Sequence, residues 1–282
     1  MILTLDIGNT NMKTGLFAAV DDASDQSEQS AELAANPRIS RLKGLEMRQY
    51  WRLATNRNRT SDEYGMALMN LLKHHGIDPG QIEGIMMSSV VPQINFTIEH
   101  MCRNYFGMEP MKIEPGVKTG INIKYENPRE LGSDRIANAV AAYELYGGPC
   151  ITIDFGTATS FGAISAKGEF LGGAICPGLK LAADALTENT AKLPRFELVK
   201  PESAIGRTTV ANMQAGIVYG YIGQIKYLVN RMKREMNVPD IKVIATGGLA
   251  VLVAGESSVI DVMDGLLTLK GLCLIYEKNK DR

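Results

Sequence analysis

The chain lacks the features that would send it into or across a membrane. None of its 282 residues lies in an apolar run of the roughly 18 residues needed to span a bilayer. The N-terminal stretch ILTLDIGN has no basic segment and reaches Asp6 almost at once, unlike a signal peptide. We therefore expect a cytoplasmic protein that makes no membrane contact.

Cysteine and histidine are both scarce. The four cysteines are far apart and form no CxxC pair: Cys102, Cys150, Cys176 and Cys273. The three histidines are His74, His75 and His100. No spacing among these residues matches a zinc site, so we expect free thiols in a reducing compartment.

A strong excess of either charge is also missing. The chain has 30 Lys and Arg against 31 Asp and Glu, a net charge of −1, and no basic block. This balance gives no reason to expect a nucleic-acid partner. The hydrophobic fraction of 45% is ordinary for a globular protein, and the length suits two modest domains or one large one.

What the chain does have is an internal repeat. Residues 2–17 read ILTLDIGNTNMKTGLF, and residues 151–164 read ITIDFGTATSFGAI. Aligning Asp6 with Asp154 also aligns Gly8 with Gly156, because both pairs are 148 residues apart (154 − 6 = 148). Each copy predicts a strand, a tight turn and a second strand. A single Asp-x-Gly is usually only a turn, but two copies at a domain-sized spacing favour a duplicated fold that grips a polyphosphate.

The remaining pattern alternates strands and helices. Helices are expected at 61–75, 93–106, 134–146, 178–192, 209–236 and 259–275, and strands at 47–55, 82–92 and 241–245. Thr60 or Ser61 caps the first helix, and its C-terminal end carries the His pair. The pattern predicts an α/β fold with mixed sheets and two domains, 1–148 and 149–282. Residues 21–44 are polar and predict a surface insertion.

Four further segments carry possible chemistry. In YENPRELGSDR (125–135), Asp134 is either a helix N-cap or a base beside the anion donor Arg135. In residues 172–194 a Pro-Gly turn precedes a helix, which suits an anion site or simply a well-made turn. In VIATGGLA (243–250) a strand ends in Thr-Gly-Gly, which suits close approach to a base or ribose.

The fourth segment, residues 205–225, begins a long helix capped by Thr208 or Thr209. Its small residues allow another helix to approach closely, either inside the fold or in a dimer: Ala215, Gly216, Gly220 and Gly223.

These segments carry a family resemblance. The DxGxT…DxGT pair resembles the phosphate loops of the sugar kinase, heat-shock chaperone and actin ATPase superfamily. That resemblance implies duplicated ribonuclease-H-like, actin-like ATPase domains with a nucleotide cleft between them. Six ordered segments resemble the type III pantothenate kinases over nearly the whole chain except 21–44: DIGNTNMK, LGSDR, DFGTAT, PGL…TAKLP, IGRTTV…MQAG and TGGLA.

The resemblance implies an activity and its cofactors. Members of this family use ATP to phosphorylate the 4′-hydroxyl of pantothenate, the first committed step of coenzyme A biosynthesis. They require Mg²⁺ and a monovalent cation such as K⁺ or NH₄⁺, and they work as homodimers. The expected partners are therefore ATP, pantothenate and a second copy of the chain.

The resemblance also implies roles for individual residues. The ATP phosphate loop consists of Asp6, Ile7, Gly8, Asn9, Thr10, Asn11, Met12 and Lys13, with Asp6 near the metal. Thr157 contacts an ATP phosphate, and Asp154 binds the monovalent cation. Pantothenate is bound by Tyr125, Gly132, Ser133, Asp134 and Arg135, and by Thr209 from the partner subunit. Asp134 is the general base and Arg135 binds the pantothenate carboxylate.

Three positions depart from the family pattern. Ser133 stands where Ala is usual, Gly162 where a polar or acidic residue is common, and Thr208 where Asn is usual. None of these changes removes a charged group from the expected chemistry, and the backbone role of residue 133 is expected to survive.

Three other functions compete with this interpretation. A chaperone-like ATPase would need room for a client-binding domain, which the chain lacks. An inactive relative is disfavoured by the intact Asp6, Asp134, Arg135 and Asp154. A kinase for a sugar is disfavoured by the GSDR and TAKLP segments.

Overall fold

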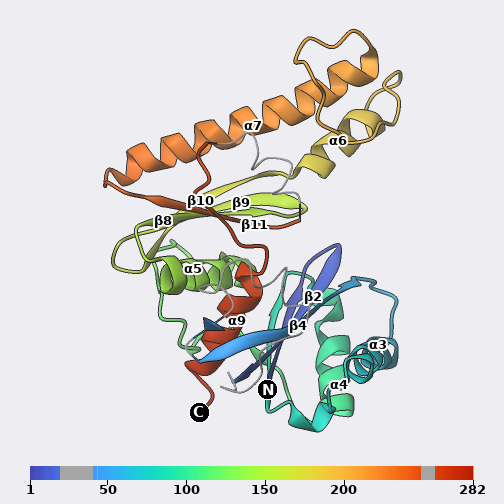
Figure 1. Cartoon of the computed structure of the whole chain (residues 1–282), viewed down its shortest axis with the longest axis vertical. Helices are drawn as coiled ribbons and strands as arrows, with labels where there is room; N and C mark the ends of the chain where they lie inside the picture. The colour runs from blue at the N-terminus through green and yellow to red at the C-terminus, as the bar shows by residue number, and fades with distance from the viewer. Residues whose placement is uncertain (20–40, 43, 249–257, 282) are drawn as a thin grey trace. The chain divides into compact units, whose positions relative to one another are not determined.

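A computed structural model describes residues 1–19, 41–42, 44–248 and 258–281, which form two compact units (Figure 1). The first unit comprises Met1–Gly120, Arg129–Ala141 and Thr268–Arg282. The second comprises Ile121–Pro128 and Ala142–Leu267. The C-terminal segment thus belongs with the N-terminal part of the chain. The division into domains 1–148 and 149–282 stays a prediction.

The first unit is built on a six-stranded sheet of order β3-β4-β2-β1-β5-β6. Its strands are β1 (Ile2–Ile7), β2 (Asn11–Ala19), β3 (Arg41–Leu42), β4 (Leu45–Ala54), β5 (Gly84–Ser89) and β6 (Met111–Lys112). Alternate residues of β1, Leu3, Leu5 and Ile7, enter the core with Leu68 and Leu72 of α3 (Ser61–His74) and Ile98 of α4 (Asn95–Phe106). Because alternate side chains of a strand point to opposite faces, Thr4 and Asp6 lie on the other face.

The second unit has a sheet of order β12-β11-β8-β9-β10-β7. Its strands are β7 (Asn122–Ile123), β8 (Cys150–Phe155), β9 (Ala158–Ile164), β10 (Glu169–Pro177), β11 (Lys242–Thr246) and β12 (Val262–Met263). Ile151, Ile153 and Phe155 pack with Ile222 and Ile225 of the long helix α7 (Thr209–Met236). Figure 1 shows α7 running along one face of this sheet.

The two sheets share one strand plan. In the first, β1 pairs antiparallel with β2 and parallel with β5. In the second, β8 pairs antiparallel with β9 and parallel with β11. The central strand of each sheet, β1 or β8, therefore carries the repeated Asp near its C-terminal end. The duplication expected from the sequence is confirmed at the level of topology.

Most of the expected elements are present with close boundaries. Thr60 caps α3 in a capping box with Glu63, and His75 ends that helix with its Nδ1 2.8 Å from the carbonyl of Leu71. Helix α7 has the predicted bounds, and Thr208 is its N-cap. Helix α5 (Ser133–Tyr146) ends at Gly147, which has φ of 78° and donates to the carbonyl of Tyr143. Helix α6 (Leu179–Glu188) is shorter than expected.

The helix expected at 259–275 is partly wrong. Helix α9 spans only Leu267–Glu277, and the residues before it pair with β11. Asp261 both donates to and accepts from the backbone of Val243, and the N–H of Asp264 donates to Ala245. These hydrogen bonds to β11 pair the backbone groups of this segment. Pairing within the sheet therefore outweighs the apolar spacing that predicted a helix here.

Helix α9 packs closely on α5 within the first unit. Thr268 donates a hydrogen bond to Asn138 Oδ1 at 2.8 Å, and both side chains are buried. A methyl group at Gly271 would fall on the backbone carbonyl of Ala137, so only glycine lets the helices approach this closely. Asn279 then bonds the backbone of Lys118, which ties the end of the chain to the segment after β6.

The insertion expected at 21–44 lies mostly outside the described residues. At its end, Arg41 and Leu42 form β3 and pair with β4, and Leu42 is buried. The cysteines are all free, as expected, and burial raises the pKa of Cys102 and Cys150 to about 12. Among the helices of the described residues, none is long and apolar enough to cross a membrane.

Candidate active site

The first Asp-x-Gly turn joins β1 to β2 in the first unit. The N–H of Gly8 donates to the carbonyl of Asn11 at 3.0 Å and closes the turn. Thr55, just after β4, donates its hydroxyl to the carbonyl of Gly8 at 2.7 Å and its N–H to the carbonyl of Thr10 at 3.0 Å. Asn9 and Thr10 remain exposed at the tip. A neighbouring strand therefore holds the turn in place while leaving its tip open to a ligand.

The charged residues of this turn face each other. Asp6 and Lys13 are register partners on β1 and β2, and Lys13 Nζ lies 3.8 Å from Asp6 Oδ2. Both side chains are largely buried, at 11% and 19% exposure, so their charges are only weakly screened by solvent. Ile7 and Met12 point into the core, so they offer a ligand only their backbone. The predicted ATP loop, Asp6–Lys13, is one continuous turn with a carboxylate and an ammonium at its base.

The predicted pantothenate segment begins α5. The carbonyl of Gly132 accepts the first helical hydrogen bond, from Ile136, so Gly132 occupies the N-cap position. Asp134 therefore lies in the first turn and is not the N-cap residue. Its Oδ1 accepts from the N–H of Arg135 at 2.8 Å. A methyl group on residue 132 would lie 2.5 Å from this oxygen, so glycine leaves the space that the carboxylate occupies.

Ser133 has a role that sequence reasoning missed. Its Oγ lies 2.8 Å from Ser88 Oγ, accepts from the N–H of Ser89 at 3.2 Å and donates to the carbonyl of Ser89 at 3.4 Å. Ser88 is only 1% exposed and is the register partner of Asp6. The hydroxyl of Ser133 thus fastens the start of α5 to the end of β5, beside the strand that carries Asp6. The only sign of this contact in the sequence was Ser at position 133, where the family usually has Ala.

The second Asp-x-Gly turn joins β8 to β9 in the second unit. Here the N–H of Gly156 donates to the carbonyl of Ala158 at 3.2 Å, so the aligned glycine closes the turn as Gly8 does, one residue sooner. The N–H of Gly178 donates to the carbonyl of Thr157 at 3.1 Å. A methyl group at Gly178 would lie 2.5 Å from the carbonyl of Gly156. Because Gly178 is the N-cap of α6, the positive end of that helix lies against the turn.

Helix α7 also holds this turn. The buried hydroxyls of Thr159 and Tyr221 are hydrogen-bonded to each other, and the Tyr221 ring packs against Phe155 at a centroid distance of 6.2 Å. Burial raises the pKa of Tyr221 to about 12, with a smaller contribution from nearby groups that include Asp154. The phenol therefore stays protonated and remains a hydrogen-bond partner for Thr159. Sequence reasoning did not identify this pair.

Three other predicted or suggested positions belong to the second unit. Tyr125 is half-buried, with its ring 6.3 Å from that of Phe170. Thr209 is the exposed first residue of α7, and no hydrogen bond within the described parts joins it to the other predicted site residues. Gly247 has φ of 98°, and a methyl group there would lie 2.5 Å from the carbonyl of Phe155. The Thr-Gly-Gly segment therefore passes directly beside the end of β8; residues 249 and 250, the last two of the TGGLA motif, lie outside the described residues.

The predicted residues thus form two groups. The first unit brings together Asp6–Lys13 and Gly132–Arg135, which are linked through β5 by Ser88 and Ser133. The second unit contains Tyr125, Asp154, Thr157 and Thr209, of which Asp154 and Thr157 share one turn.

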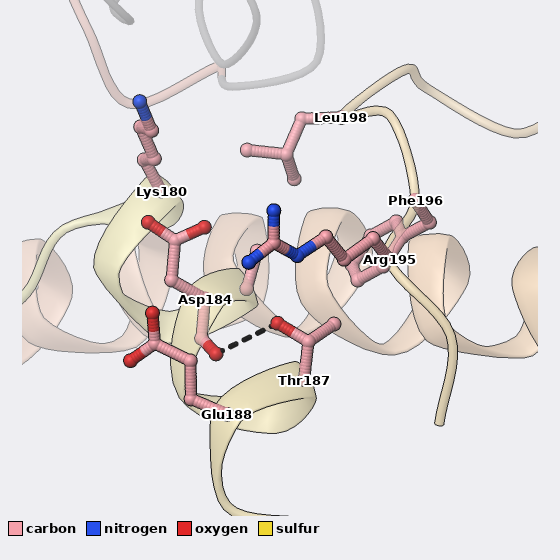
Figure 2. Close-up of a pocket in the computed structure, with 8 residues that line it drawn as sticks. Lys180, Asp184, Thr187, Glu188, Arg195, Phe196 and Leu198 are labelled. Atoms are coloured by element: carbon pink, nitrogen blue, oxygen red, sulfur yellow. Dashed lines mark hydrogen bonds between the residues drawn. The ribbon is translucent and has the colours of Figure 1, made fainter. Parts of the chain in front are cut away.

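A separate pocket of about 480 Å³ lies along α6. Figure 2 shows Lys180, Asp184 and Glu188 of α6 on one side and Arg195, Phe196 and Leu198 of the following segment on the other. Thr187 donates its hydroxyl to the carbonyl of Asp184 at 2.9 Å. None of the predicted site residues lines this pocket, so we do not assign it to the reaction.

The family model described as type III pantothenate kinase matches residues 2–231. The chain belongs to this family. A type III pantothenate kinase from Bacillus cytotoxicus is 49% identical over 279 residues, which cover 99% of this chain and 97% of that protein.

Two solved structures extend the comparison to the fold. A conserved protein from Campylobacter jejuni, assigned to the Baf family of transcriptional activators, has a TM-score of 0.58 at 20% identity. The alignment covers 99% of this chain and 100% of that one. A Sinorhizobium meliloti protein assigned as a 2-dehydro-3-deoxygalactonokinase has a TM-score of 0.54 at 10% identity, covering 99% and 97%. At these identities the likeness concerns the fold, which is the duplicated α/β fold of the sugar kinases and actin-like ATPases.

The residues of both turns fit the ligands of such a kinase. In the first unit a largely buried carboxylate and a lysine adjoin an open turn, which suits a divalent metal with its phosphates. In the second unit a single carboxylate adjoins a glycine-closed turn and a helix N-terminus, which suits a phosphate and a singly charged cation.

The Ser133 contact predicts a measurable coupling. Replacing Ser133 with Ala leaves the buried Ser88 hydroxyl without this partner and should lower the free energy of unfolding by about 1–3 kcal/mol. In the Ser88→Ala/Ser133→Ala double variant the loss should be smaller than the sum of the single losses, by about 0.5 kcal/mol or more. Urea unfolding of the four proteins measures this cycle. Strictly additive losses would mean that the two hydroxyls do not stabilise each other.

Proposed function

We propose that the chain is an ATP-dependent pantothenate kinase that transfers the γ-phosphoryl group of ATP to the 4′-hydroxyl of pantothenate, the entry to coenzyme A synthesis. Membership of the type III family carries this proposal. The repeated carboxylate-and-glycine turn supports it, because each sheet offers one open, glycine-closed turn beside a carboxylate.

The ATP phosphates are bound by the turn Asp6–Lys13 and by Thr157. Lys13 supplies a positive charge, and the exposed tip of the turn, Asn9 and Thr10, brings its backbone close to the phosphates. Asp6 would help to hold the divalent ion, which would neutralise charge on the phosphates. The N-terminus of α6 beside Thr157 adds partial positive charge on the other loop.

Asp134 acts as the general base. Its carboxylate takes the proton of the 4′-hydroxyl while the hydroxyl oxygen forms a bond to the γ-phosphorus and the bond to ADP breaks. Arg135, which is 9% exposed, binds the carboxylate of pantothenate and so fixes the hydroxyl at the other end of the substrate. Gly132 and Ser133 hold this pair at the start of α5, and Tyr125 makes a further substrate contact.

Asp154 binds a monovalent cation, K⁺ or NH₄⁺. The single carboxylate of Asp154 balances the single positive charge of such an ion. The position of Asp154 before Gly156 and Thr157 would let the cation stabilise the phosphate that this turn receives.

The active form is a homodimer formed along α7. Gly216, Gly220 and Gly223 are exposed on this helix, and a methyl group at any of them would meet nothing within 4 Å. This glycine face lets a second helix approach closely, while Ala215 lies on the buried side. Thr209, exposed at the start of the helix, would then reach the pantothenate of the partner subunit.

The activity itself is the first test. Purified protein with ATP and Mg²⁺ should release ADP when pantothenate is added, measured in a coupled assay. A panel of sugars serves as the control for the wider kinase superfamily. ADP release with a sugar and none with pantothenate would refute the proposed substrate.

The role of Asp134 predicts a selective loss of turnover. Asp134→Asn should lower kcat by about 10²–10⁴-fold, the usual contribution of a positioned base, while the unfolding midpoint changes little. Asp240→Asn is the matched control, because Asp240 is exposed and its φ of 54° is well tolerated by Asn. Near wild-type turnover in Asp134→Asn would remove Asp134 from the role of base.

The shared site predicts complementation. Asp134→Asn and Thr209→Val, each poor alone, should regain activity when co-refolded, because a mixed dimer has one pocket free of both changes. With random mixing about a quarter of the wild-type sites would be restored. Asp134→Asn mixed with Asp134→Ala is the control and should stay inactive. A fully active monomer in light scattering, or no recovery on mixing, would exclude a shared site.

A further inference from the structure

Within the described residues, the hydroxyl of Thr246 is a buried polar group without a hydrogen-bond partner. Thr246 ends β11, its side chain is fully buried, and its Oγ1 makes no hydrogen bond in the part of the chain that the structure describes. Buried polar atoms are nearly always paired, so an exception of this kind calls for a ligand or another explanation.

The register of the sheet brings Thr246 next to Asp154. The two residues are direct partners in the parallel pairing of β11 with β8. Phe155 packs against Tyr221 of α7, so Asp154, one residue earlier, points to the opposite face of the sheet. Register partners share a face, and neighbouring strands lie about 4.8 Å apart. The hydroxyl and the carboxylate therefore lie side by side on the face that α7 does not cover.

The first unit shows the same arrangement with its hydroxyl occupied. There Asp6 is the register partner of Ser88 on the neighbouring parallel strand. The Ser88 hydroxyl bonds Ser133 at the start of α5. In the second unit no side chain of the described ranges takes the place of Ser133, so the hydroxyl beside the repeated carboxylate is left for a ligand.

We propose that Thr246 Oγ1 is a ligand of the monovalent cation that Asp154 holds. This inference rests on the proposed cation site at Asp154. A hydroxyl is a neutral oxygen ligand, so it adds coordination without adding charge, and the single carboxylate then matches a single positive charge. The hydroxyl hydrogen of Thr246 can rotate away from the ion, so that a lone pair of Oγ1 faces it.

The test measures cation binding separately from catalysis. Unfolding midpoints are followed during KCl titration, with choline chloride keeping the ionic strength constant. Thr246→Val keeps the shape but removes the hydroxyl, and it should raise the K⁺ concentration for half-maximal stabilisation about tenfold, the effect of losing about one polar contact. Thr246→Ser keeps the hydroxyl and should stay within about twofold of wild type. Asp154→Ala should abolish the K⁺ response.

Thr152→Val is the matched control. Thr152 lies on the same strand and face as Asp154 and is 5% exposed, but its hydroxyl already bonds the carbonyl of Gly162. Its loss should lower stability without moving the K⁺ midpoint. If Thr152→Val moves the midpoint as much as Thr246→Val does, the effect reflects loss of packing and the proposal fails.

Replacing the ligand atom tests the role of Thr246 independently, and this test still applies if Thr246→Val does not fold. Thr246→Cys replaces a hard oxygen by a soft sulfur, so it should favour Tl⁺ over K⁺ relative to wild type, as read from the two stabilisation curves. An unchanged Tl⁺ to K⁺ ratio overturns the assignment of Thr246. A K⁺ response that survives in Asp154→Ala overturns the proposed cation site itself. A response lost in Asp154→Ala but normal in Thr246→Val overturns only this inference.

Discussion

The architecture of each unit depends on one hydrogen-bonded turn. A glycine N–H closes the chain on itself directly after the Asp that ends the central strand, at Gly8 in one unit and at Gly156 in the other. That turn reverses the chain into an antiparallel partner while the other side of the central strand pairs in parallel. The carboxylate is thereby held at the C-terminal end of a central strand, directly beside the turn.

What differs between the two turns is how each is supported. The first is held from β4 by Thr55, and the base of the turn is an ion pair between Asp6 and Lys13. The second rests on backbone, through Gly178 at the start of α6, and on the Thr159–Tyr221 pair from α7. A duplicated framework thus carries one turn with an ion pair at its base and one turn supported by two helices, α6 and α7. The two turns therefore differ in their support although they share one strand plan.

The sequence predicted the repeat, the strand plan and most helices, because these follow from local periodicity and capping. The capping box at Thr60 and Glu63 and the bounds of α7 are examples. It did not predict contacts between distant segments. Ser133 meets Ser88 and Tyr221 meets Thr159 only because the sheet brings them together. The same reason explains the error at 259–275, where pairing with β11 replaced the first turns of the expected helix. Of the predicted site, the two turns and the start of α5 are local motifs, so their sequences predict their conformation. The role proposed for Thr209 needs a partner chain, and no local motif could test it.

The place of α9 has a consequence for how the protein is made. The last residues, Thr268–Arg282, belong to the unit that contains the N-terminus, where Gly271 seats α9 on α5 and Asn279 bonds Lys118. During synthesis the strands of the first sheet therefore leave the ribosome long before α9, the helix that completes the same unit. The first unit therefore lacks its last helix until the whole of the second unit has been synthesised. Folding of the two units cannot proceed in simple sequence order, and a chain that stops a few residues early would leave the older half unfinished.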